Sequence, residues 1–127
     1  MSNQIAAVRE GLKAAMDEAD LRAFTIVPER YTPPAVIIEP GDPYITLEGA
    51  TFGGFIVHHR LIVIAGIGIN EVTAADLDGR ILKALDAVPD DHAINEVERP
   101  GRWDVNGQAH PAAVIRVMTE VIRAEEE

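Results

Sequence analysis

The stretch from Phe52 to Ala65 constrains the fold more than any other part of the chain. Read at the two-residue period of a strand, one face carries Phe55, Val57, His59, Leu61, Val63 and Ala65, and the other carries Ile56, His58, Arg60, Ile62 and Ile64. This alternation, rich in β-branched residues, predicts one long β-strand. Because both faces are largely apolar, the strand should lie in the interior of a sheet. We expect helices to cover one side, and either more of the chain or a neighbouring subunit to cover the other.

Two segments have helical patterns. Residues 3–19 repeat apolar side chains at spacings of three and four opposite a charged face, which predicts an amphipathic helix. A second helix is expected from Thr73 to about Val88, because Thr73 and Asp76 have the spacing of a capping box and Pro89 stops the pattern.

The first half of the chain also predicts two short strands, at Leu21–Val27 and Ala35–Glu39, joined by an extended proline-rich connector. From Pro40 to Gly54 we expect a long loop, and its apolar residues indicate that it docks onto something.

In the second half, Ile94–Glu98 alternates as an edge strand does, and Asn106-Gly107 is a hairpin turn pair. The segment Ala112–Arg123 fits either a strand or a helix face, and its Val and Ile content favours the strand. Glu125–Glu127 is expected to be a frayed end.

The composition limits the classes of function. The 127 residues suit one domain, residues 1–127, with an aliphatic core, since 47% are hydrophobic and only 5% aromatic. A formal net charge of −10 argues against a nucleic-acid-binding module and against binding to anionic membranes, yet it suits a route along which DNA slides without sticking. The chain has no cysteine and no signal-peptide pattern, and its apolar runs fall short of the ~20 residues that span a membrane. We expect a soluble protein.

Motifs that could carry chemistry are weak. His58 and His59 point to opposite faces of a strand, so they cannot share a metal ion, and His59 is expected to be a hydrogen-bonded core residue or to lie at a subunit contact. Asp90-Asp91-His92 is interpreted as a solvated turn. Gly66-x-Gly68 lacks the third glycine of a dinucleotide fingerprint, and position 71 is Glu. With no serine-nucleophile motif either, we expect no catalytic, cofactor or metal site, which favours a structural or interaction protein.

Three aromatic residues, Tyr31, Tyr44 and Trp103, fall in predicted loops. Amphipathic aromatic side chains in loops anchor interfaces, and they also serve as local caps over a core, so both roles stay open.

The order of these pieces resembles one family. A proline-rich connector leads into Pro33-Pro34-Ala35-Val36-Ile37-Ile38, then come Asp42-Pro43-Tyr44, a long strand opened by Phe52, a helix with Asp76-Leu77-Asp78 and Leu82-Lys83-Ala84-Leu85, a Pro100-Gly101 loop and a final Val/Ile strand. This order resembles the tail terminator (tail completion, or minor tail) proteins of bacteriophages with long, flexible tails. The resemblance covers nearly the whole chain, and Pro-Pro-Ala-Val-Ile-Ile is its most distinctive part.

The resemblance implies an α+β fold, a twisted, mixed, mainly antiparallel sheet with two helices packed on it. It implies a homohexameric ring, without enzymatic activity, that caps the tail tube, ends tube polymerisation and offers a surface for joining the head. The implied partners are further copies of the chain, the major tail tube protein and a head–tail connector protein, with DNA passing through the bore without specific binding. The implied location is the tail of the virion, after assembly in the host cytoplasm.

The expected contacts with the tube or with neighbouring subunits rest on loop length and composition. No family motif assigns them. The residues are Tyr44, Ile45, Leu47, Phe52, Ile56, Ile62, Ile64 and Trp103. Two alternatives stay open: another head–tail connector or neck protein, and a small α+β enzyme or ligand-binding domain that uses Gly66–Glu71 with His58 or His59.

Overall fold

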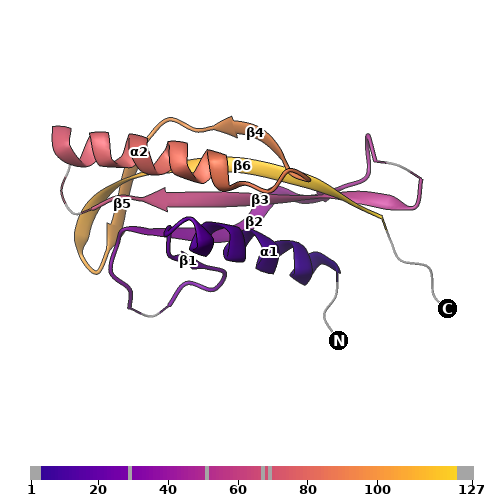
Figure 1. Ribbon diagram of the computed structural model, residues 1–127, viewed down its shortest axis with the longest axis horizontal. Coiled ribbons are helices and arrows are strands. Elements are labelled where there is room, and N and C mark those ends of the chain that lie inside the picture. The colour runs from indigo at the N-terminus through magenta and orange to yellow at the C-terminus, as the bar shows by residue number, and fades with distance from the viewer. Residues whose placement is uncertain (1–3, 29, 51, 67, 69, 123–127) are drawn as a thin grey trace.

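The chain forms two helices and a six-stranded sheet in the computed structural model, which describes residues 4–28, 30–50, 52–66, 68 and 70–122. In chain order the elements are α1 (Gln4–Glu18), β1 (Ala23–Phe24), β2 (Ala35–Thr46), β3 (Gly54–Ile64), α2 (Glu71–Ala87), β4 (Ala93–Val97), β5 (Gly101–Val105) and β6 (Gln108–Ile122). Only the β1–β2 pair is parallel among these strands, and both helices lie on the same side of the sheet (Figure 1). The α+β fold with a mixed, mainly antiparallel sheet is therefore confirmed.

The long alternating strand lies at the centre of the sheet, as its two apolar faces predict. The strand order is β1-β2-β3-β6-β4, and β5 pairs with the same strand, β6, as β4 does. β3 pairs with β6 along its whole length, from Gly54 opposite Ile122 to Ile64 opposite Ala112. This pairing makes the ambiguous segment a strand, and β4 lies at the edge, as predicted.

The two helices bury one face of the sheet. Leu12 and Met16 of α1, with Leu77 and Ala84 of α2, are inaccessible to solvent or nearly so. They belong to one core with alternate residues of the strands, namely Val36, Ile38, Leu61, Val63, Ala113, Ile115 and Val117. The helical stripes and the strand alternation thus meet in a single apolar layer.

Within the described residues, one end of the opposite face is sealed and the other end stays partly open. Near the start of β2, the buried residues Ile37, Ile62, Ile64 and Ala112 pack against Phe24, Tyr31 and Trp103. Ile62 and Ile64 are fully buried there, so their expected place in an interface is corrected: they belong to the core. Towards the other end of β3, Ile56, His58 and Arg60 remain partly exposed.

The long loop expected from Pro40 to Gly54 is wrong in its first half. β2 continues to Thr46 across an irregularity between Pro40 and Ile45, and then pairs Ile45 with Val57. Prolines are tolerated because β1 pairs only with Val36 and Ile37, which leaves the outer edge of β2 without a neighbour among the described strands. Tyr44 therefore lies in a strand and not in a loop.

Other boundaries also differ from the prediction. Trp103 lies in β5, and the Leu21–Val27 strand shrinks to Ala23–Phe24 because only these residues find a partner strand. The capping box at the start of α2 consists of Asn70 and Thr73, because Asn70 is the N-cap and Thr73 its third helical residue. Neither helix in the described part of the chain has the length and apolar character needed to cross a membrane.

Candidate functional site

Apolar side chains gather at one end of the sheet, around the loop that joins β2 to β3. Phe52 is fully exposed, Leu47 is 72% exposed, Ile122 is 53% exposed and Ile45 is 41% exposed. Beside them lies a hollow of about 300 Å³, lined by Ile5, Ile45, Leu47, Gly54 and Phe55. We call these residues (Ile5, Ile45, Leu47, Phe52, Phe55 and Ile122) the tip surface. Figure 1 shows the β2–β3 loop at one end of the long axis, the end where α1 begins and β6 finishes.

The glycines of this loop allow the tight turn between β2 and β3. Gly49 and Gly53 have φ angles of 84° and 85°, a region that residues with a Cβ seldom adopt. The turn closes with a backbone hydrogen bond of 3.1 Å from Ala50 to Leu47. At Gly54 a Cβ would come within 3.0 Å of the Ile122 side chain, so the absence of a side chain lets β3 and β6 approach there.

The predicted contact residues divide into separate groups. Ile45 and Leu47 line the hollow at the tip surface, and Phe52 is fully exposed in the loop between β2 and β3. Ile56 lies on the half-open face of the sheet, opposite Thr46 and Glu120, whereas Trp103 packs over the sealed half of that face.

The sequence did not single out Ile5, Phe55 and Ile122 as contact residues. Ile122 reaches the tip only because β6 pairs with β3, and its segment was ambiguous between strand and helix. The apolar stripe of the first helix and the start of the long strand were the only signals for Ile5 and Phe55.

Tyr44 turns towards the helices and covers a buried histidine. Its ring meets His59 edge-on, with centroids 5.9 Å apart, and its hydroxyl accepts a 3.5 Å hydrogen bond from the Arg9 guanidinium. His59 is 1% exposed, and neither ring nitrogen has a hydrogen-bond partner within the described residues. Burial, with smaller contributions from Arg9, His92 and His58, lowers the pKa of His59 to about 4. The core placement of His59 is confirmed, but the expected hydrogen bond is not found.

The other two histidines of the predicted motifs behave differently. His58 faces the opposite side of β3, where its Nε2 lies 2.9 Å from the Thr46 hydroxyl, as alternation predicts. His92 corrects the solvated-turn interpretation, because its side chain is only 4% exposed while Asp91, 2.9 Å from its Nδ1, is 79% exposed. The burial of His92 could not be predicted from the sequence, because the elements beside it, α1 and β3, lie far from residue 92 along the chain.

The half-open face carries a row of charges across four strands. Arg60 of β3 binds Glu39 of β2, and Arg116 of β6 binds Glu98 at 2.6 Å, with Glu96 of β4 at 3.7 Å. Arg60 and Arg116 lie directly opposite each other. Each arginine therefore has a carboxylate on its outer side, which offsets the repulsion between the two cations.

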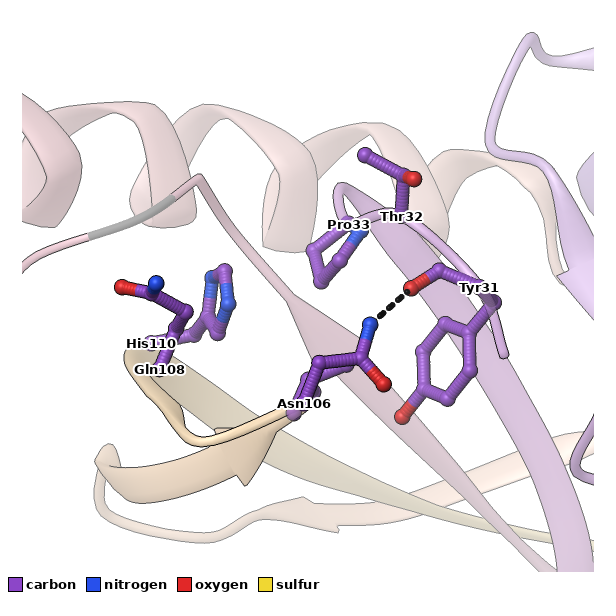
Figure 2. Close-up of a pocket in the computed structure, with 7 residues that line it drawn as sticks. Tyr31, Thr32, Pro33, Asn106, Gln108 and His110 are labelled. Atoms are coloured by element: carbon purple, nitrogen blue, oxygen red, sulfur yellow. Dashed lines mark hydrogen bonds between the residues drawn. The ribbon is translucent and has the colours of Figure 1, made fainter. Parts of the chain in front are cut away.

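A second hollow, of about 280 Å³, lies at the far end of the sheet from the tip surface, next to the β5–β6 hairpin (Figure 2). It is lined by Tyr31, Thr32, Pro33, Val105, Asn106, Gln108 and His110. The Asn106 amide donates a 3.1 Å hydrogen bond to the Tyr31 carbonyl, which ties the hairpin to the connector. His110 Nδ1 donates a 3.1 Å hydrogen bond to the Ala65 carbonyl. The site is small and offers few groups for chemistry.

The alternative based on Gly66–Glu71 gains little from this geometry. His58 and His59 do not line the hollow next to the β5–β6 hairpin. Thr73 stabilises the turn before α2 by donating a 2.8 Å hydrogen bond to the Gly68 carbonyl. Across residues 4–28, 30–50, 52–66, 68 and 70–122, no three His, Asp or Glu side chains are grouped as metal ligands.

Comparison of the sequence with the models of known protein families and with curated proteins finds no match. Among the described residues, the tip surface is the strongest candidate for an interaction site.

Proposed function

We propose that the chain is a tail terminator protein: a subunit of a hexameric ring that caps the tail tube of a long-tailed bacteriophage. The observation that carries this proposal is the tip surface, where a small protein exposes Phe52, Leu47 and Ile122 at one end. Contiguous exposed apolar residues mark interaction sites in soluble proteins. The choice of family rests on the resemblance in the order of sequence elements, from Pro33-Pro34 to the last strand.

The energetics favour a covered tip. Burying one large apolar side chain contributes roughly 1.5–3 kcal/mol, so leaving several in water forgoes a large share of the stability of a small domain. A ring covers such a surface in every copy at once, because each subunit meets two neighbours through two different patches.

The charge suits the same role. A net charge of −10 per chain, repeated around a ring, gives a negative bore that repels the DNA backbone and lets it pass without specific binding. The proposed partners beyond the ring itself are the major tail tube protein and a head–tail connector protein. In this role the protein works by assembly in the host cytoplasm and stays in the tail of the virion, with no reaction catalysed.

Light scattering after size-exclusion chromatography, with negative-stain microscopy, tests the proposal. We expect annular particles with six times the 13.8 kDa mass of the chain. Phe52→Asp should reduce them to monomers without unfolding the protein. Leu82→Asp is the matched control, because Leu82 is 65% exposed on α2, away from the tip, and this variant should assemble normally. A chain that stays monomeric up to its solubility limit, or that forms particles without a central hole, would refute the ring.

A further inference from the structure

We infer that the tip surface of one copy receives the connector of the next copy, at Ile26 and Val27. This inference rests on the proposed ring and names its contact. The connector patch is defined as Arg22, which directly precedes β1, together with Ile26, Val27 and Arg30 of the segment between β1 and β2.

The connector patch also exposes adjacent large apolar residues. Ile26 is 82% exposed and Val27 is 55% exposed, and neither belongs to either buried cluster of the sheet. Figure 1 shows the segment between β1 and β2 at the lower left, away from the β2–β3 loop at the upper right. Two apolar patches at different places on one subunit fit a head-to-tail contact.

One hydrogen bond and two ring contacts join the two ends of the connector. The Arg22 guanidinium donates a 2.8 Å hydrogen bond to the Thr32 carbonyl and lies 5.6 Å from the centroid of the Phe24 ring. Phe24 in turn packs against Tyr31, with ring centroids 5.8 Å apart. These contacts hold the two ends of the connector together, which lowers the conformational entropy lost on docking.

Charge distinguishes this contact from a symmetric one. The tip carries the exposed Glu48, next to Leu47, whereas the connector patch carries the exposed Arg22 and Arg30. Within the described residues, Arg22 and Arg30 take no part in an ion pair, unlike most other cations of the chain: Lys13, Arg60, Arg80, Arg102 and Arg116. Tip against tip would bring two Glu48 carboxylates together, while tip against connector brings opposite charges together.

A contact of this kind is the one that a ring requires. Pairing two different patches of the same subunit is a heterologous contact, which propagates from copy to copy and closes when the rotation between copies allows it. The apolar side chains Ile26 and Val27 would enter the hollow of about 300 Å³ between Ile45, Leu47 and Phe55.

Cysteine cross-linking tests the contact directly, because the natural chain has no cysteine to interfere. Leu47→Cys and Ile26→Cys are made in separate chains, mixed and oxidised. We expect a disulfide-linked dimer from the mixture and none from either variant alone. One chain carrying both substitutions should give a ladder of linked copies that ends at the ring number. Val72→Cys, 78% exposed on α2, replaces Ile26→Cys as the matched control and should not cross-link to Leu47→Cys.

The outcomes separate the contact from the ring. If Leu47→Cys alone forms dimers, the tips meet each other and the inference is wrong. If annular particles form but the mixture does not cross-link, the ring stands and this contact is wrong. If light scattering shows monomers throughout, both are wrong.

Charge reversal gives an independent measurement. Arg30→Glu and Glu48→Arg should each raise the protein concentration at half-assembly about tenfold, since like charges then face each other. The double variant should restore assembly to near the level of the natural chain. Equal and additive losses in the double variant would contradict the pairing of these two patches.

Discussion

Lowering the pH from 7 to 5 should destabilise the folded chain through His59. The ring of His59 is 1% exposed and is held neutral, with its pKa lowered from 6.5 to about 4. In the unfolded chain the same imidazole takes up a proton near its ordinary pKa. Between these two values the unfolded state binds more protons than the folded state, so stability falls as the pH falls.

The magnitude follows from the shift. Each pKa unit corresponds to about 1.36 kcal/mol, so the contribution of His59 should fall by about 2 kcal/mol between pH 7 and pH 5, and by about 3 kcal/mol at pH 4 and below. This is a large fraction of the stability of a small domain. The physical cause is the cost of placing a charge in a dry site beside the Arg9 cation.

Urea unfolding, followed by circular dichroism and by the fluorescence of the single tryptophan, Trp103, measures the effect. The protein concentration is chosen so that light scattering shows one oligomeric state at both pH values. His59→Phe keeps an aromatic ring against Tyr44 but cannot take up a proton, so its loss between pH 7 and pH 5 should be about 2 kcal/mol smaller than that of the natural chain. His58→Gln is the control, because it changes the neighbouring histidine on the other face and leaves His59 in place. If His59→Phe lost as much stability as the natural chain, the assignment of the effect to His59 would be refuted.

Three further predictions concern the fold and its assembly. Asn70→Ala should lower the free energy of unfolding by about 1 kcal/mol by removing the N-cap of α2, and Asn70→Ser should retain most of it, as thermal unfolding would show. Ile62→Ala should cost roughly 2–5 kcal/mol, whereas Ile122→Ala, at a half-exposed position, should cost much less; equal losses in urea titrations would contradict the buried placement of Ile62. Raising the salt from ~10 mM to ~150 mM should promote assembly, since copies with a net charge of −10 repel each other less; light scattering that shows dissociation would count against this.

The features that the sequence predicted correctly depend on local periodicity. Two apolar faces require cover on two sides, so the run after Phe52 could only be a central strand. The stripe with Leu12 and Met16 predicted which face of the first helix is buried, and the pair Asn106-Gly107 predicted the β5–β6 turn, where both residues have positive φ angles.

The errors came from partners that are distant in sequence. Pro40 and Pro43 predicted a loop, yet β2 continues because β3 pairs with it and no described strand pairs with its outer edge at the prolines. His92 reads as a solvated turn residue, and its burial depends on what packs beside it. Ile62 and Ile64 read as a face in need of a neighbouring subunit, but Trp103, from far along the chain, covers that end.

The candidate site was only partly predictable for the same reason. The loop composition predicted Ile45, Leu47 and Phe52 as contact residues, and each of them is exposed. Ile122 joined them only through its pairing with Gly54, sixty-eight residues away along the chain. The connector patch was predicted as part of a strand and its connector, and nothing local showed that Ile26 and Val27 would stay exposed.

By itself, the amino-acid sequence determined the periods: which residues are helical, which alternate, and which faces must be shielded from water. Only the tertiary structure decided which shield each face received, and so which apolar residues remained uncovered. The physical reason is that periodicity is set by the backbone over a few residues, whereas cover is supplied by strand register and packing between segments that the chain brings together only on folding.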